Sequence, residues 1–178
     1  MKNTKPLLLV EDDNVSAMAV IRVFNDLKIP KIVIHLGNGE EAVKYLSDNT
    51  LEKPDLILLD LNMPRMNGVE FLKIIKRDSI LRSIPVVMFT TSDDKRDIEE
   101  CFGLNVAGYI VKPVDPELFQ EMIRIVVAYW SNNEVPKQQE KHKRYNILTS
   151  VRKNQVMTER EVIINREIYR KYGGHHNN

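Results

Sequence analysis

The stretch LILLDLNMP, at residues 56–64, places a continuous apolar run directly before an aspartate, Asp60. Two other short runs, LLLV at 7–10 and VVMF at 86–89, are also apolar at every position. Strands of this kind are typically buried on both faces, as in a parallel sheet that helices cover. The run at 31–36 includes His35, which indicates a more peripheral strand.

Short apolar runs alternate with longer amphipathic stretches throughout residues 1–130. The runs lie at 6–10, 31–36, 55–59, 85–89 and 107–111. Each following stretch begins with a residue type that caps helices, and these residues are Asn14, Asn38, Asn67, Asp94 and Asp115. Five repeats of strand and helix predict a doubly wound (βα)5 α/β fold with a parallel sheet. Right-handed crossovers then place helices on both faces.

The chain divides into a body at 1–130 and a C-terminal extension at 131–178. SNNEVP at 131–136 ends the last helix, because a proline cannot continue it. Residues 1–136 carry 16 Lys and Arg against 21 Asp and Glu, whereas residues 137–178 carry 10 against 4. We therefore expect an acidic folded body and a basic extension that is partly helical or disordered. Thr158 and Glu161 form a candidate capping box there.

Several classes of protein are excluded by composition. No apolar run approaches the 18 or so residues that a membrane-spanning helix needs. No charged segment followed by an apolar run opens the chain as a signal peptide does. The single cysteine, Cys101, excludes an intramolecular disulfide framework and fits a reducing compartment, so a cytoplasmic location is expected.

Polar residues collect where the predicted strands end. In an open parallel α/β sheet, ligands bind beyond the carboxyl ends of the strands. These ends carry Glu11, Asp12 and Asp13, then Asp60 and Asn62, then Thr90, Thr91 and Ser92, and finally Lys112 and Pro113. The negative charges of crowded carboxylates need a divalent cation or a lysine to compensate them. Mg2+ prefers oxygen ligands, which carboxylates and a phosphate group both supply. The set predicts phosphoryl transfer onto a carboxylate, which gives an acyl phosphate.

Four motifs at these positions resemble the receiver domain of two-component response regulators. They are VEDD at 10–13, LLDLNMPRMNG at 58–68, MFTTS at 88–92 and YIVKP at 109–113. The resemblance covers about residues 4–130 and implies a flavodoxin-like fold with strand order 2-1-3-4-5. It also implies that Asp60 is the phosphoacceptor. The Mg2+ ligands would be Asp12, Asp13, Asp60 and the backbone carbonyl of Asn62.

The same resemblance implies roles for the residues after the fourth strand and around the fifth. Thr90, Thr91 and Lys112 would bind phosphoryl oxygens. Thr90 and Tyr109 would form a switch pair that changes position together. The peptide bond between Lys112 and Pro113 would be cis. The protein would then be a phosphoacceptor switch that signals by protein–protein binding, with no enzymatic activity beyond its own Mg2+-dependent phosphoryl transfer and dephosphorylation.

The expected partners are a sensor histidine kinase and a second copy of the chain. AYWSNNEVP at 128–136 and RSIPVV at 82–87 resemble the small regulators of phytochrome-type or hybrid kinases. The last helix is apolar around most of its circumference. If Phe119, Ile123, Val126 and Trp130 face the sheet, then Leu118, Met122, Ile125 and Tyr129 form an exposed patch. We expect a homodimer through the fourth helix, fifth strand and fifth helix.

Other interpretations remain open at this point. The extension could fold back over this patch with Val162, Ile164 and Ile168. It could also bind nucleic acid through its cations, but a binding role for the extension is not the expected one. A nucleotide or flavin binder of the same fold is disfavoured, because EDDN stands where a glycine-rich phosphate loop would follow the first strand. A haloacid-type phosphatase using the same acids is the remaining alternative.

Overall fold

The computed structural model describes residues 5–29 and 31–131. Its strands are β1 (Leu7–Val10), β2 (Val33–Leu36), β3 (Leu56–Leu59), β4 (Val86–Thr90) and β5 (Gly108–Val111). The helices are α1 (Asn14–Asp26), α2 (Gly39–Ser47), α3 (Gly68–Arg77), α4 (Lys95–Gly103) and α5 (Pro116–Ser131), with a short 3-10 helix, η1 (Leu81–Ser83). The strands are parallel in the order β2-β1-β3-β4-β5, which confirms the predicted fold.

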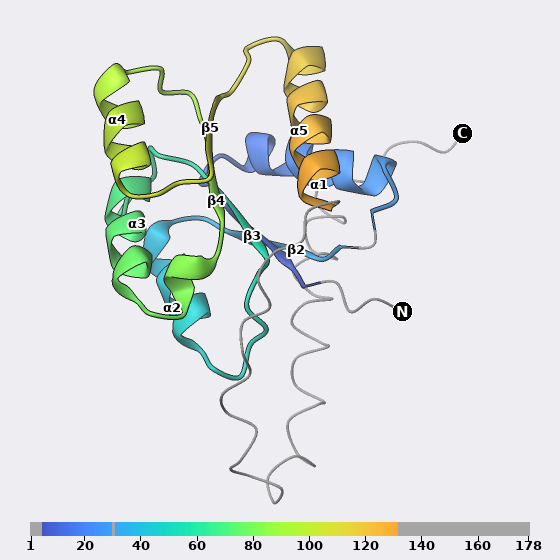
Figure 1. Cartoon of the computed structure of the whole chain (residues 1–178). Helices are drawn as coiled ribbons and strands as arrows, with labels where there is room; N and C mark the ends of the chain where they lie inside the picture. Colours follow the sequence, from blue (N-terminus) through green and yellow to red (C-terminus); the bar gives the residue numbers. More distant parts are fainter. Residues whose placement is uncertain (1–4, 30, 132–178) are drawn as a thin grey trace, which may run out of the picture. The chain divides into compact units, whose positions relative to one another are not determined.

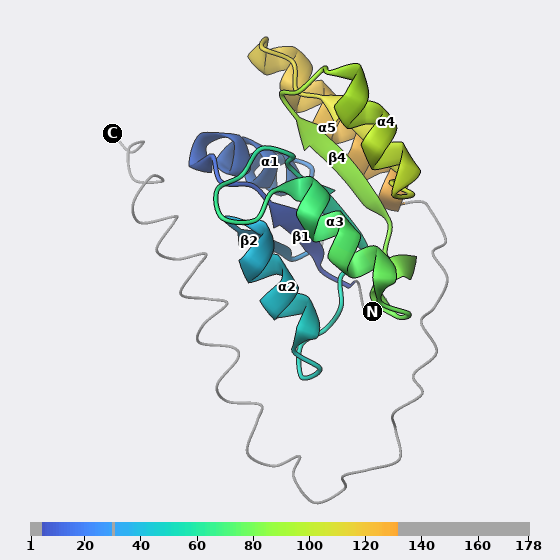
Figure 2. The same cartoon turned by 90° about the vertical axis from the view of Figure 1, so that its left-hand side faces the viewer.

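Helices cover both faces of the sheet. Figure 1 shows α2, α3 and α4 on one side and α1 and α5 on the other, and Figure 2 shows the same layers after a quarter turn. Successive side chains of a strand point to opposite faces. Leu8 and Val10 of β1 therefore pack in the core beneath α2 and α3, while Leu7 and Leu9 pack in the core beneath α1 and α5. This double burial explains why the central strands are apolar at every position.

The helix starts follow the predicted capping residues in four of five cases. Side chains of Asn38, Asn67 and Asp94 accept backbone N–H groups at the starts of α2, α3 and α4, and Asn67 forms a full capping box with Glu70. Asp115 accepts from the first turn of α5. The prediction for α1 was wrong by one residue, because the cap is the preceding aspartate and Asn14 is the first helical residue.

The two surfaces of α5 are arranged as predicted. Ile123 and Val126 are buried, and Phe119 and Trp130 pack against them on the sheet side. The exposed apolar residues of this helix are Leu118, Met122, Ile125 and Tyr129, with exposed fractions between 39% and 62%. An apolar patch therefore lies on the outer surface of α5.

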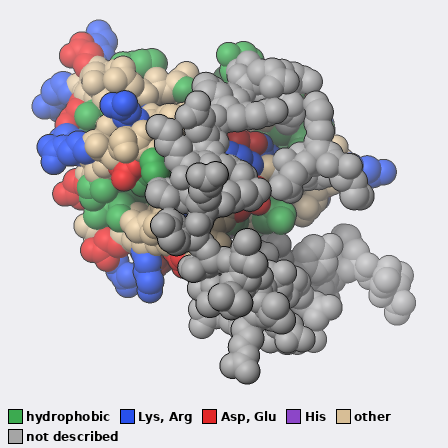
Figure 3. All heavy atoms as spheres, turned by 60° about the horizontal axis from the view of Figure 1, so that its bottom comes forward, with side chains coloured by type: hydrophobic (Ala, Val, Ile, Leu, Met, Phe, Trp, Pro, Cys, Tyr) green, Lys and Arg blue, Asp and Glu red, His purple; other side chains and the backbone are tan. Residues whose placement is uncertain are grey.

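The described surface also carries many charges. On the face shown in Figure 3, Lys and Arg side chains are interspersed with Asp and Glu side chains. Among the described residues, no helix has the length and apolar character to cross a membrane. The extension from residue 132 onward, with its candidate capping box at Thr158 and Glu161, lies outside the described residues.

Candidate functional site

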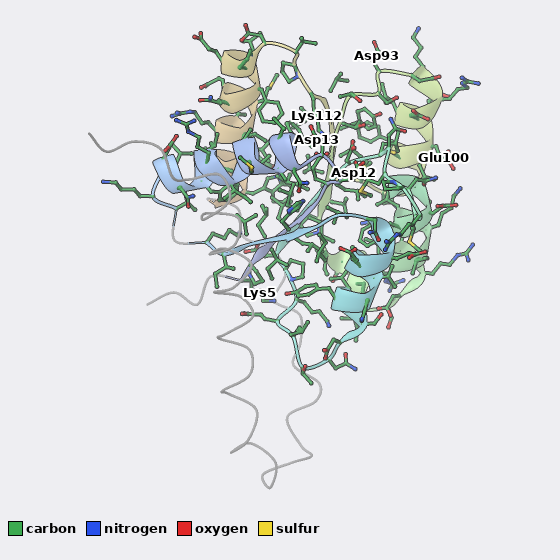
Figure 4. All side chains as sticks on the ribbon, turned by 180° about the vertical axis from the view of Figure 1, so that it is seen from behind. Lys5, Asp12, Asp13, Asp93, Glu100 and Lys112 are labelled. Atoms are coloured by element: carbon green, nitrogen blue, oxygen red, sulfur yellow. The ribbon has the colours of Figure 1, made fainter. Side chains whose placement is uncertain are left out.

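The carboxyl ends of β1, β3 and β5 bring the predicted site residues to one edge of the sheet. The register pairs Val10 with Leu59, so the acids after β1 lie beside Asp60. Figure 4 shows Asp12, Asp13 and Lys112 close together at this edge, while Lys5 lies at the opposite end of β1. A pocket of about 510 Å3 opens here. Its lining includes Glu11, Asp12, Asp13, Asp60, Asn62, Thr91, Lys112 and Pro113.

Asp60 is held firmly by its own loop. Its side chain is buried, and its Oδ1 accepts the N–H of Leu61 at 2.8 Å. The loop then returns to the same place, because Gly68 donates its N–H to the Leu61 carbonyl at 2.9 Å. A Cβ at position 68 would lie 2.4 Å from the Asp60 carbonyl oxygen, closer than two such atoms can approach. The glycine at the start of α3 thus allows the close contact that fixes the Asp60 backbone.

Three carboxylates converge on this point. Ligand atoms of Glu11, Asp12 and Asp60 all lie within 4.8 Å of one another, a spacing that could hold a metal ion. Carboxylate oxygens are the ligands that a hard divalent cation prefers. Asp12 and Asp60 were predicted as ligands, and the structure brings them together.

Asp13, the other predicted ligand, lies outside this cluster. Its carboxylate caps α1, accepting the N–H groups of Val15 at 3.0 Å and Ser16 at 3.3 Å. Glu11 lies in the cluster instead; the sequence analysis placed Glu11 at this edge of the sheet but did not name it as a ligand. The ends of the two elements decide which acid does what. Because β1 ends at Val10, Glu11 is the first residue beyond the strand, and Asp13, two residues later, is the residue that caps α1. The immediate position of Glu11 after the apolar run was the signal for its role.

Lys112 lies between the carboxylates. Its Nζ is 2.5 Å from Glu11 Oε2 and 3.8 Å from Asp60 Oδ1. Ser16 donates its hydroxyl to the same Glu11 oxygen at 3.0 Å. Burial raises the pKa of Glu11 above its ordinary value, against the opposing effect of Lys112, while the charge of Asp60 raises that pKa further. Ionised Glu11 therefore lowers the stability of the folded protein.

The predicted cis bond before Pro113 is not found, since the structure contains no cis peptide bond among its described residues. Trans is the preferred form of a bond before proline by about 0.5–1 kcal/mol. In the trans form Lys112 already reaches both Glu11 and Asp60, so this arrangement of the lysine needs no cis bond.

The residues predicted to bind or sense a phosphoryl group fall into two sets. Asn62 and Thr91 are exposed and line the pocket. Thr90 is fully buried, and its Oγ1 accepts the N–H of Ser92 at 3.3 Å. Tyr109 donates its hydroxyl to the Ser92 carbonyl at 3.1 Å, and burial raises the pKa of this tyrosine. The predicted switch pair is thus joined through Ser92, a residue to which the sequence analysis gave no role.

Comparison with known proteins agrees with this geometry. A family model described as the response regulator receiver domain matches residues 7–124. The probable methanogenesis regulatory protein FilR2 of Methanothrix harundinacea (strain 6Ac) is 35% identical over 127 residues, which cover 70% of this chain and 82% of the relative.

Two solved structures resemble the chain in fold and sequence. The phosphorylated cyanobacterial phytochrome response regulator RcpA has a TM-score of 0.72 and 32% identity, covering 75% of this chain and 99% of the other. The Mn2+-bound form of response regulator Rcp1 gives the same TM-score, identity and coverage.

Proposed function

This chain belongs to the family of response regulator receiver domains, and on that premise we propose that it accepts a phosphoryl group on Asp60 from a histidine kinase. The observation that carries the proposal is the arrangement around Asp60. A buried carboxylate lies within 4.8 Å of two other acids and 3.8 Å from the amine of Lys112. Three acids with one lysine suit a divalent cation, and the cation and the lysine together would compensate the charge that a phosphoryl group brings.

The carboxylate oxygens of Asp60 have different surroundings. Oδ1 accepts the Leu61 N–H and faces Lys112, whereas Oδ2 accepts no hydrogen bond among the described residues. Oδ2 is therefore the oxygen that attacks phosphorus. A P–O bond forms as the bond between phosphorus and the donor's histidine nitrogen breaks, and the electron pair of that bond leaves with the nitrogen. Lys112 then neutralises a phosphoryl oxygen as a compact charge.

Glu11, Asp12 and Asp60 would hold Mg2+, together with the backbone carbonyl of Asn62. The ion supplies positive charge at the phosphoryl oxygens. Support comes from the relatives, because RcpA is described in a phosphorylated form and Rcp1 in a Mn2+-bound form. RcpA is a phytochrome response regulator, so a phytochrome-type histidine kinase is the proposed donor.

Phosphorylation is proposed to change the surface with which the protein binds its partners. Thr90 is proposed to turn its hydroxyl toward the phosphoryl oxygens, and Tyr109 to follow it inward. The receiver would occupy residues 1–130 and act in the cytoplasm by binding other proteins, with residues 131–178 as a separate basic extension. Apart from transfer to and hydrolysis from its own Asp60, no enzymatic activity is proposed.

Intact-mass measurement tests the acceptor. Wild-type protein incubated with a small phosphodonor and Mg2+ should gain one phosphoryl group, and Asp60→Asn should gain none. Asp26→Asn, which removes an exposed carboxylate at the far end of α1, is the matched control and should be modified like wild type. Wild-type protein that stays unmodified with Mg2+ present would exclude this function.

The patch on α5 supports a homodimer. Leu118, Met122, Ile125 and Tyr129 expose apolar surface that a second copy would cover through α4, β5 and α5. Sedimentation of Ile125→Glu should show a monomer, while Ile74→Glu, at an exposed isoleucine of α3, should leave the dimer intact. A wild-type chain that stays monomeric with and without beryllofluoride contradicts the dimer.

A further inference from the structure

Glu11 is fixed at its backbone as well as at its carboxylate. Its N–H donates to the Leu36 carbonyl at 2.9 Å. Its own carbonyl oxygen lies 2.7 Å from the imidazole Nε2 of His35. A carbonyl oxygen has no proton to give, so Nε2 of His35 carries the proton and is the donor. Strand β2 thus holds both backbone groups of the residue that follows β1.

The direction of the His35 side chain follows from the alternation along β2. Val33 packs in the core beneath α1 and α5, whereas Ile34 and Leu36 pack in the core beneath α2 and α3. Successive side chains point to opposite faces, so His35 shares the face of Val33, which α1 covers. His35 is half-buried, and a hydrogen bond shielded from water is stronger than one in bulk solvent. The sequence analysis took this histidine only as a sign of a peripheral strand, but the structure gives it a defined partner.

The hydrogen bond from His35 orients the next residue of the loop as well. The carbonyl of Glu11 and the N–H of Asp12 belong to one planar peptide unit, so holding the carbonyl holds the plane that joins the two residues. The loop between β1 and α1 is short, since it spans only residues 11–13. The Asp12 carboxylate is exposed, and no described residue donates a hydrogen bond to it. Its position beside Asp60 therefore depends on how the backbone of the loop is held.

We propose that His35 is a positioning residue for the Mg2+ site, because it holds the peptide between Glu11 and Asp12 and so keeps both carboxylates directed at the ion. This inference rests on the proposed function, which takes Glu11, Asp12 and Asp60 as the acidic ligands. Removing a group that orients a metal ligand typically costs 10–100-fold in metal affinity. The Glu11 carboxylate keeps its own side-chain partners without His35, so the loss falls mainly on Asp12 and lies at the lower end of this range.

Calorimetric titration of the full chain with Mg2+ tests the proposal. His35→Ala and His35→Asn should each raise the dissociation constant for Mg2+ about 10-fold, because alanine has no donor and the asparagine amide is one bond too short to reach the carbonyl. His35→Gln should bind Mg2+ nearly as well as wild type, since its amide nitrogen lies the same number of bonds from the backbone as Nε2 of histidine. This rescue separates a hydrogen bond from packing alone.

Val33→Ala is the matched control. It removes apolar packing from the same face of β2 without touching Glu11, so it should lower the urea midpoint of unfolding while its Mg2+ affinity stays that of wild type. An equal loss of Mg2+ affinity in Val33→Ala and His35→Ala would overturn the positioning role, because the loss would then follow the packing of β2 and not the hydrogen bond.

The remaining outcomes separate this inference from the proposed function. Wild-type protein that binds Mg2+ but never gains a phosphoryl group would overturn phosphorylation at Asp60, while loss of Mg2+ affinity in His35→Ala with rescue in His35→Gln would still support the role of His35. Wild-type Mg2+ affinity in both His35→Ala and His35→Asn, or binding by His35→Gln as weak as that of His35→Ala, overturns the role of His35 and leaves the phosphoacceptor in place.

Discussion

Replacing Glu11 with glutamine should weaken Mg2+ binding strongly at a modest cost to the fold. Glu11 is buried, and burial raises its pKa even though Lys112 is 2.5 Å away. A carboxyl whose pKa is raised is less stable as an anion in the folded protein than in the unfolded chain. Glutamine removes the charge, but both Glu11 oxygens accept hydrogen bonds and the NH2 group of glutamine would face a donor, so the free energy of unfolding without Mg2+ should fall by no more than about 1–3 kcal/mol.

The loss of metal affinity follows from the spacing of the acids. The three ligand atoms lie within 4.8 Å of one another, so an ion held among them would lie closer than that to Glu11. Even at 4.8 Å, the Coulomb energy between a unit charge and a divalent ion is about 7 kcal/mol at an effective dielectric constant of about 20. Desolvation and the repulsion from Lys112 remove most of this energy. Changes to groups that tune a metal site typically cost 10–100-fold in affinity, and we expect a loss of about that size.

Calorimetric titration with Mg2+ and urea unfolding together make the assay. Asp13→Asn is the matched control, because it removes one negative charge from the same loop while asparagine still caps α1. Its Mg2+ affinity should fall by less than about threefold, the effect of one screened charge near the site. Equal losses of Mg2+ affinity in Asp13→Asn and Glu11→Gln would refute the assignment of Glu11 to the cluster and of Asp13 to the cap.

Three further changes should have separable effects. Gly68→Ala places a Cβ 2.4 Å from the Asp60 carbonyl oxygen, so it should lower the free energy of unfolding by about 3 kcal/mol in urea and slow phosphorylation in the mass assay. Gly103→Ala, with open space around its Cβ, is the control: its free energy of unfolding should stay the same or rise, and its phosphorylation should match wild type. Asn67→Ala removes the capping box of α3 and should cost about 1 kcal/mol in urea unfolding. Burial raises the thiol pKa of Cys101 to about 11, so the unfolded thiol ionises first and stability should fall from pH 9.0 to about 11. Cys101→Ala should show a shallower fall over that range, and an equal fall in both proteins contradicts this cause.

The local patterns of the sequence determined the architecture. The runs LLLV, LILL and VVMF are apolar at every position because alternate side chains enter two separate cores, so they indicated a covered parallel sheet before any contact was known. Asn38, Asn67, Asp94 and Asp115 marked helix starts, since a cap depends only on the next few residues of the chain. Asp60 could be identified because it directly follows a buried strand.

Only the tertiary structure decided which neighbouring residue takes which role. In the stretch EDDN every side chain has an oxygen that can cap a helix, and three of them are carboxylates that could bind a metal. The pattern alone therefore does not decide which acid caps the helix and which ones face the metal site. Pairing of β1 with β2 and β3 ends the strand at Val10 and turns Glu11 toward Lys112, which lies 101 positions further along the chain. The part played by Ser92 was equally hidden, because its partners Tyr109 and Asp97 belong to a different strand and to a helix. Composition and periodicity report what a residue does within its own element, whereas contacts between elements depend on how the strands align.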